Sequence, residues 1–395
     1  MMMFPPQRSV AAPEPKTLGR PRDLRIDFFR GLALICIFID HVPGNRLAHL
    51  TLQNFGFSDA AEVFVLLAGF SAALAYGSTF QRDGWAAGLS RIGRRIAKLY
   101  AAHLILLAVC VGGLAVVARA VENPVYFEHV NLTPFGYDPF GAIWRALVLQ
   151  HQPAYLNILP LYVLLLAWFC IVIALARVHA ALALATSAGL WAVANITGLN
   201  LPSYPEPFGW YFNPFAWQFL FSLGVLAGLA HRRGVTVPRS RYLFMAAMTY
   251  LLFAFVAAAP WSNIPGLHQL QLLPSEFIGH ISKENLSPWR LVNVLAFAYV
   301  CAVLIPASAG WLKHPCIGWV INLGRNALSV FCAGTVLSLA GFVILVEIDR
   351  GFVAQAAVNL GGLGSMGLIA WWAGHRRPIQ RAAGSRDGVV SGQVL

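Results

Sequence analysis

The chain has 395 residues, of which 58% are hydrophobic and only 11% are charged, and its formal net charge is +12. This composition is typical of an integral membrane protein and excludes an ordinary soluble domain. Runs of eighteen or more mostly apolar residues recur along the whole length, which favours helices over an outer-membrane barrel with its short alternating segments.

We therefore expect an all-α, polytopic membrane protein of about ten transmembrane helices with both termini in the cytosol. Residues 1–26 are Pro-rich and basic without an apolar core, and they predict a disordered cytosolic tail. Residues 27–374 form a single transmembrane domain, and residues 375–395 form a second cytosolic tail. The predicted spans are 28–43, 59–79, 99–118, 156–176, 180–196, 214–230, 242–260, 289–309, 320–346 and 352–373.

The basic residues set this orientation. Segments 82–98 and 231–241 and the C-terminal tail are rich in Lys and Arg, whereas the long segments 119–155 and 261–288 hold few. Basic loops of membrane proteins face the cytosol, so the positive net charge reflects topology and predicts no nucleic-acid partner. No CxxC motif or metal-ligand pair occurs among the six cysteines, which predicts neither disulfides nor a metal site. We find no repeat of fixed period and no second soluble domain.

The first span carries ionisable residues that a bilayer disfavours. It contains Arg30, Asp40 and His41 in an otherwise apolar stretch, and such groups inside a membrane segment indicate a functional site. Arg30 and His41 are eleven residues apart, which is about three turns of a helix. Their directions around the helix axis would differ by roughly 20°, and they would lie about 16 Å apart along the axis. One helix face would therefore hold a cation near one membrane surface and an imidazole near the other.

Three carboxylates lie close to His41 in the sequence. Asp40 precedes it but points about 100° away around the helix, so Asp59 or Glu62, at the start of the next span, is the better candidate to orient or charge the imidazole. Asp59 could equally be a helix N-cap after Ser58, whereas Glu62, one turn further in, is harder to explain as a cap. The simpler alternative for His41 is a buried histidine that bonds a neighbouring backbone.

A cationic stripe precedes the third span. Arg91, Arg94, Arg95 and Lys98 recur at intervals of three, four and seven residues, which places them on one helix face. Membrane topology alone would explain several of these cations, but guanidinium groups also bind phosphate oxygens in pairs. The stripe is therefore a candidate site for a polyphosphate molecule approaching from the cytosol, and Arg325 in the ninth span either joins that site or extends toward the membrane surface.

Amide and aromatic residues gather at the predicted outer ends of the spans. Such groups bind sugars by hydrogen bonding and stacking, and they also anchor helices at the membrane interface. The residues of this kind are Gln150, His151, Gln152, Asn157, Asn213, Trp217 and Gln218.

Several of these motifs resemble those of the acyltransferase 3 superfamily of membrane acyltransferases. The similar motifs are Arg30-x10-His41, Arg91-x-x-Arg94, residues 64–70, which carry Ala68 where that family usually has Ser, and residues 323–329. More specifically, the chain resembles the OpgC branch, whose members are taken to attach succinyl groups to osmoregulated periplasmic glucans. The segments that carry this resemblance are 22–31, 40–45, 54–62, 156–160 and 213–218.

The resemblance implies a bacterial inner-membrane enzyme that uses cytosolic acyl-CoA, most simply succinyl-CoA, as co-substrate, with a periplasmic glucan as acceptor and no tightly bound cofactor. Arg30, Arg91 and Arg94 would hold the CoA phosphates, with Arg95, Lys98 and Arg325 beside them. His41 would deprotonate the sugar hydroxyl or accept the acyl group itself; we favour the direct route because one base suffices. The predicted catalytic residues are His41, Glu62, Asp40 and Asp59, and the predicted acceptor-binding residues are Asn45, Arg46, Asn157, Asn213, Trp217 and Gln218.

Two kinds of alternative stay open at this level. The enzyme could transfer acetyl or another acyl group, or use another glycan. The succinyl group of a donor ends in a carboxylate and needs a cation; Arg46 is a candidate for it or else merely a solvated loop residue. The chain could instead be a proton-coupled transporter with Asp40, His41 and Glu62 as a relay, although the paired broken helices of many transporters are not visible. The sequence leaves the oligomeric state open.

Overall fold

The computed structural model describes residues 22–205, 208–258, 273 and 281–390, with side chains up to residue 376. These residues form helices and no β-strand. The α-helices are α1 Leu24–Asp40, α2 Ala60–Arg82, α3 Gly84–Val121, α4 Val125–His129, α5 Pro134–Tyr137, α6 Pro139–Leu147, α7 Ile158–Val178, α8 Ala180–Thr197, α9 Pro214–Arg232, α10 Arg241–Ala258, α12 Pro288–Leu304, α13 Pro315–Arg325, α14 Ala327–Glu347 and α15 Phe352–Val390. Short 3₁₀ helices are η1 Arg46–Leu50, η2 Leu52–Asn54 and η4 Gly310–Lys313.

Eight described helices are long and apolar enough to cross a membrane: α2, α3, α7, α8, α9, α10, α14 and the part of α15 from Phe352 to Arg376. Helices α1 and α12, with 17 residues each, are shorter than these eight. The all-α, multi-pass prediction is confirmed, whereas the count of ten spans is not. The cytosolic placement of both termini stays a prediction.

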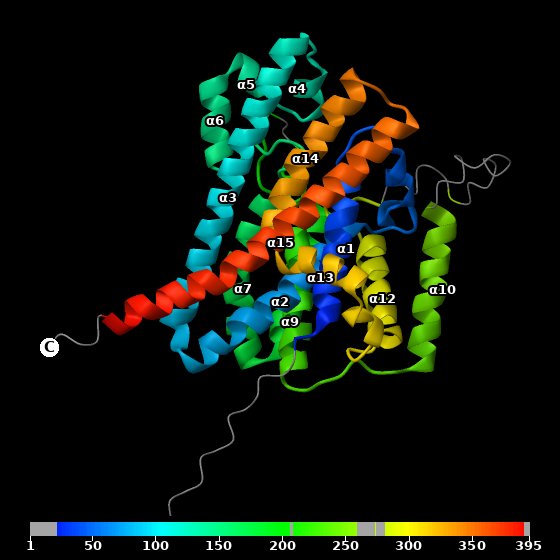
Figure 1. The fold of residues 1–395 in the computed structure, drawn as a ribbon. Helices are drawn as coiled ribbons and strands as arrows, with labels where there is room; N and C mark the ends of the chain where they lie inside the picture. Colours follow the sequence, from blue (N-terminus) through cyan, green and yellow to red (C-terminus); the bar gives the residue numbers. More distant parts are fainter. Residues whose placement is uncertain (1–21, 206–207, 259–272, 274–280, 391–395) are drawn as a thin grey trace, which may run out of the picture.

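Helix α1 lies in the interior of the bundle, where it contacts α2, α13 and α14 (Figure 1). Helices α1 and α13 approach closely because each has a glycine at the contact between them. A Cβ atom at Gly31 would collide with the carbonyl oxygen of Val320, and one at Gly324 would collide with that of Asp27. Small residues allow membrane helices to approach each other in this way, and here they fix the polar side chains of α1 relative to those of α13.

Helices α2 and α9 form the most extensive helix pair. Gly69 of α2 faces the carbonyl oxygen of Phe221, and Gly224 of α9 faces that of Leu66, so any larger residue at either glycine would separate the helices. This pair and α1 form a rigid support for the segment before α2, which carries Asp59. Helix α10, in contrast, lies at the edge of the bundle against α12 (Figure 1).

The helices differ from the predicted elements in two places. The basic segment 82–98, predicted as a loop, is the first part of the 38-residue helix α3. It is helical because Ile92 and Leu99, seven residues apart, are buried on one side of the helix. The ninth span, 320–346, is two helices interrupted at Asn326, whose Nδ2 donates to the carbonyl oxygens of Asn322 and Ala370, both at 3.0 Å.

The domain boundaries also shift. Helix α1 begins at Leu24, inside the predicted tail 1–26, because the carboxylate of Asp23 caps it by accepting the backbone N–H of Arg25. Helix α15 continues to Val390, well into the predicted tail 375–395. The predicted outer segment 119–155 contains α4, α5 and α6, and most of the segment 261–288 lies outside the described residues.

Candidate active site

A cavity of about 530 Å³ opens at the C-terminal end of α1. We call it the histidine cavity because His41 lines it, together with the beginnings of α2 and α7 and residues 203–204 and 208–212. The charged side chains in its wall are Asp40, Asp59, Lys283 and Glu284, and the rings in its wall include Tyr155, Tyr204, Trp210 and Tyr211. Aromatic faces beside carboxylates and amides suit a neutral, hydroxyl-rich ligand, since rings stack on apolar faces and oxygens accept hydroxyl protons.

His41 follows the last residue of α1, where its backbone N–H donates to the carbonyl oxygen of Ile37 at 3.0 Å. The imidazole lies against the ring of Tyr155, with 4.5 Å between the ring centroids. The Tyr155 hydroxyl in turn lies 3.0 Å from Nε2 of His129. Nδ1 of His41 is buried and has no hydrogen-bond partner among the described residues, so this histidine is not the backbone-satisfied residue of the simpler alternative.

The carboxylate of Asp40 points toward the loop after α1. It accepts hydrogen bonds from the hydroxyl of Thr51 at 2.6 Å and from the side-chain amide of Gln53 at 3.0 Å. Asp40 lines the histidine cavity, but its hydrogen-bond partners are these loop residues. Asp40 therefore connects α1 to η1 and η2 at the cavity wall.

Asp59 and Glu62 form a capping box at the start of α2. Asp59 accepts the backbone N–H of Ala61 at 2.8 Å, and Glu62 accepts the backbone N–H of Asp59 at 2.9 Å. Glu62 is fully buried, and its other oxygen accepts Nε of Arg290 at 2.6 Å. The prediction that Glu62 orients the His41 imidazole is wrong, because both of its oxygens are bound elsewhere.

Asp59 bridges two cations at the edge of the histidine cavity. One of its oxygens lies 2.6 Å from Nζ of Lys283 and 3.1 Å from Nη2 of Arg290. Burial alone would raise the pKa of Asp59, but these two cations hold the pKa well below its ordinary value. Burial lowers the pKa of Lys283, yet the carboxylates of Asp59 and Glu62 outweigh this effect and raise it. The pair is thus ionised, and Asp59 is a wall residue rather than a free base.

Of the predicted acceptor-binding residues, Asn157 lines the histidine cavity, and its side chain makes no capping bond to α7. Asn45 and Arg46 do not line it. The buried amide of Asn45 exchanges hydrogen bonds with that of Asn359 at 2.9 and 3.0 Å, and the side chain of Arg46 is exposed. The loop after α1 turns these residues toward α15 and the surface, so the structure gives no support to their predicted contact with the acceptor.

The other three predicted acceptor residues are buried and support the cavity from behind. Trp217 donates its indole N–H to the carbonyl oxygens of Lys283 and Glu284, both at 3.1 Å. Asn213 caps α9 and donates to Leu199 at 2.7 Å, and Gln218 donates to the carbonyl oxygen of Ser187 at 2.8 Å. None of the three lines the cavity, so their predicted direct contact with acceptor is not supported.

A second cavity, of about 260 Å³, lies toward the other end of α1. We call it the arginine cavity because four cations line it: Arg30, Arg95, Lys98 and Arg325. Hydroxyl and amide groups complete its wall: Ser71, Tyr76, Tyr162, Asn326 and Ser329. Cations combined with hydroxyl and amide donors are the groups that bind phosphate oxygens, so the residues present fit a phosphate-bearing ligand.

Arg30 is held firmly in this wall. Its guanidinium donates to the hydroxyl of Ser71 and to the carbonyl oxygens of Leu67 and Gly324, both at 3.4 Å. The buried carboxylate of Asp27 lies 3.6 Å from Arg30 and 3.6 Å from Arg325. One buried acid thus fixes two cations of the arginine cavity, whose wall keeps a positive charge.

A model of the family described as OpgC protein matches residues 22–377. The chain belongs to the OpgC family. Comparisons with curated proteins and with solved structures found no match. Membership in the OpgC family indicates a membrane enzyme of the acyltransferase type that modifies a glucan.

Two cations predicted for the donor site of this OpgC-family protein lie outside the arginine cavity. Arg91 donates to the hydroxyl of Thr79 at 2.9 Å, and its guanidinium lies 5.9 Å from the ring centroid of Tyr76. Arg94 is exposed, and neither residue lines the cavity. The stripe exists on α3, but only its later members, Arg95 and Lys98, reach the level of Arg30.

Four residues of these sites were not singled out from the sequence: Asp27, Tyr155, Lys283 and Arg290. Asp27 had a signal, because a carboxylate in the first apolar span is costly unless paired. Arg290 had a weaker signal. It lies in the first turn of α12, where the helix dipole disfavours a cation, and this position indicates a nearby acid. Nothing in the sequence brings Tyr155, from the segment before α7, to the end of α1.

Proposed function

We propose that this OpgC-family protein transfers a succinyl group from cytosolic acyl-CoA to a hydroxyl of a periplasmic glucan, with His41 as general base. One observation carries the proposal. A cation-lined cavity and a histidine-lined cavity lie at opposite ends of α1, against the same helices. The cation-lined cavity would bind the charged end of the donor, and the histidine-lined cavity would bind the acceptor where it reacts.

The arginine cavity would bind the phosphate groups of the donor. It is smaller than the roughly 300–1,000 Å³ of typical small-molecule sites, so it would hold the phosphates and leave the thiol arm to extend along α1. From Arg30 to His41 the helix rises about 16 Å. A flexible arm of that reach would bring the thioester carbonyl to the histidine cavity.

The histidine cavity would hold the sugar hydroxyl and the thioester together. The imidazole of His41 would take the proton of the hydroxyl while the hydroxyl oxygen attacks the thioester carbonyl. The resulting tetrahedral intermediate collapses by breaking its carbon–sulfur bond, and the thiolate takes the proton from the imidazolium. The products are the sugar ester and free CoA, and His41 returns to its neutral form.

The ring of Tyr155 supports this role of His41. It contacts the imidazole and limits the orientations that the ring can adopt. A base that is already held in position loses less conformational entropy when the transition state forms. The carboxylates and amides around the cavity, among them Asp40 and Asn157, would orient the sugar by accepting and donating hydrogen bonds.

The test uses protein purified in detergent, with labelled succinyl-CoA and acetyl-CoA, with and without periplasmic glucan. Glucan labelling by wild type that is lost in His41→Ala and kept in His375→Ala would support the proposal. His375 is a suitable control because it is exposed at the far end of α15. Preference for acetyl-CoA would replace succinyl in the proposal, and the absence of both CoA binding and CoA release would overturn it.

A further inference from the structure

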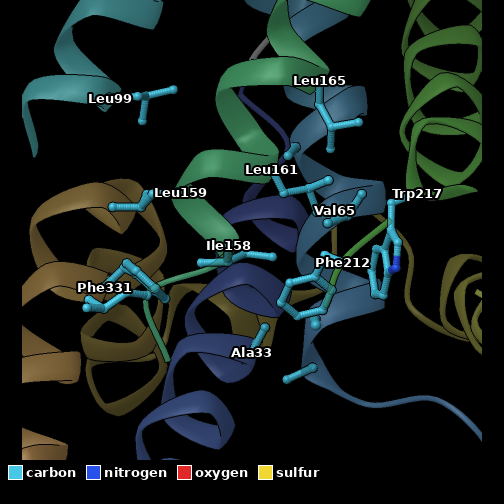
Figure 2. Close-up of a cluster of buried hydrophobic side chains, with 14 of the residues drawn as sticks. Ala33, Val65, Leu99, Ile158, Leu159, Leu161, Leu165, Phe212, Trp217 and Phe331 are labelled. Carbon is cyan, nitrogen blue, oxygen red and sulfur yellow. The ribbon is translucent and has the colours of Figure 1, made fainter. Parts of the chain in front are cut away.

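The histidine cavity and the arginine cavity share two wall residues, Ile158 and Phe331. Ile158 is the first residue of α7, and Phe331 lies one turn into α14. Both are nearly buried, at 8% and 4% exposure. Figure 2 shows their side chains extending from the two helices, with Ala33 of α1 nearby. We call this pair the neck.

The two cavities follow one another along the bundle, because residues on one face of the same helix line first one cavity and then the other. On α1, Arg30 lines the arginine cavity, while Ile37 and His41, seven and eleven residues later, line the histidine cavity. Residues at these intervals share one face of a helix. On α2, Ala61 lines the histidine cavity, and Ala68, seven residues later, lines the arginine cavity.

Helix α7 has the same arrangement across the neck. Asn157 lines the histidine cavity, Ile158 lines both cavities, and Tyr162, one turn further, lines the arginine cavity. On α14, Leu328 lines the arginine cavity one turn before Phe331. Polar groups thus line both cavities, whereas the two wall residues that the cavities share are apolar.

We propose that the neck is the subsite for the thiol arm and acyl group of the donor, and that Ile158 and Phe331 determine which acyl groups reach His41. This inference rests on the proposed function, since a donor whose phosphates lie near Arg30 must pass the neck for its thioester to reach His41. The thiol end of the arm and a short linear acyl chain are unbranched, so they fit between two apolar side chains that yield by changing rotamer.

A branched acyl group would meet the neck differently. Extra methyl groups in a close-packed space force side chains off their rotamers, so a branch next to the thioester carbonyl would be rejected. Water is excluded from the same space because Ile158 and Phe331 offer it no hydrogen-bond partner. The neck thus selects the acyl group by width, whereas the arginine cavity selects the donor by charge.

The experiment compares donors that differ by branching: succinyl-CoA with 2-methylsuccinyl-CoA, and acetyl-CoA with isobutyryl-CoA. In Ile158→Ala and Phe331→Leu, the rate with the branched donor relative to the linear donor should rise about tenfold or more, since one methyl group in an apolar site changes specificity by this much. Ile158→Trp should reduce transfer from every donor. Leu165→Ala is the matched control, because Leu165 is a buried residue of α7 that lines neither cavity.

Binding of CoA itself, measured by calorimetry on the same purified proteins, separates this inference from the proposed function. Ile158→Trp that keeps the wild-type Kd for CoA but loses transfer supports the neck. In a second outcome, wild type transfers acyl groups while the ratio of the rates with branched and linear donors is the same in Ile158→Ala, Phe331→Leu and Leu165→Ala. That result would overturn the proposed role of the neck and leave the proposed function standing. Wild type that binds no CoA and transfers no acyl group overturns both.

Discussion

Nε of Arg290 lies 2.6 Å from a carboxylate oxygen of the fully buried Glu62. This ion pair joins the start of α2 to the start of α12, two helices that are 228 residues apart at these positions. It also occupies the acid that the sequence favoured as a partner for His41. Of the two capping-box carboxylates, Asp59 lines the histidine cavity and Glu62 holds Arg290 behind it, and the imidazole is left available to a ligand.

Breaking this pair from one side should destabilise the protein strongly. Arg290→Met leaves the carboxylate of Glu62 buried without its counter-charge, and the loss of one partner of such a pair costs about 3–5 kcal/mol. We expect a clearly lower midpoint of thermal unfolding, followed by intrinsic tryptophan fluorescence in detergent. The double variant Glu62→Gln with Arg290→Met should recover part of the loss, since glutamine keeps the capping bond and carries no charge. A double variant less stable than Arg290→Met would contradict this account.

Removing the imidazole should abolish transfer without affecting donor binding. General-base groups contribute about 10²–10⁴-fold to rate, so His41→Gln should lower kcat by that factor. The Kd for CoA should stay at its wild-type value because the arginine cavity is about 16 Å away along α1. A comparable loss of CoA affinity in His41→Gln would show that the histidine supports the fold of the donor site instead.

The cations of α3 should separate into two classes. Arg95 lines the arginine cavity, whereas Arg94, its neighbour, is exposed outside it. A hydrogen bond to a charged group contributes about 1.5–3 kcal/mol, so Arg95→Ala should weaken CoA binding by about tenfold or more. Arg94→Ala removes the same charge from the same helix turn and should leave the Kd nearly unchanged. Equal losses in both variants would mean that general positive charge, and not this cavity, attracts the donor.

The sequence predicts the helices of this protein better than the positions of its side chains. Hydropathy and length locate the spans, and helix periodicity correctly relates Arg30 to His41 because both lie on one helix. The same periodicity places Arg91 and Arg94 on the stripe of α3, but it cannot say which turn of that helix lines the arginine cavity, where Arg95 and Lys98 lie. The partners of Asp59 and Glu62 lie more than 220 residues away, in a contact set by the packing of whole helices.

The break at Asn326 shows the same limit. Residues 320–346 are mostly apolar and predict one helix, but Asn326 bonds Ala370 of α15, and the chain bends there. This bend leaves Arg325 and Asn326 in the wall of the arginine cavity. The family motif at residues 323–329 marked the region, and only the tertiary contacts explain why it is polar.

Acid should destabilise the protein partly through Asp59. Lys283 and Arg290 hold the pKa of this carboxyl below its ordinary value of about 4, although burial acts in the opposite direction. Between the lowered folded value and the ordinary unfolded value, the unfolded chain binds more protons. The contribution of Asp59 to stability is therefore full above about pH 4 and is lost as the pH falls toward the folded value.

Lys283→Met tests this relationship, because it removes the closer cation and brings the folded pKa of Asp59 back toward its ordinary value. The variant should unfold at a lower temperature than wild type at pH 7, and the difference should shrink as the pH is lowered below about 4. Lys313→Met is the matched control, since Lys313 is exposed after α12 and should show the wild-type pH profile. A constant difference between Lys283→Met and wild type from pH 7 to pH 3 would mean that Lys283 stabilises the protein by packing rather than by its charge on Asp59.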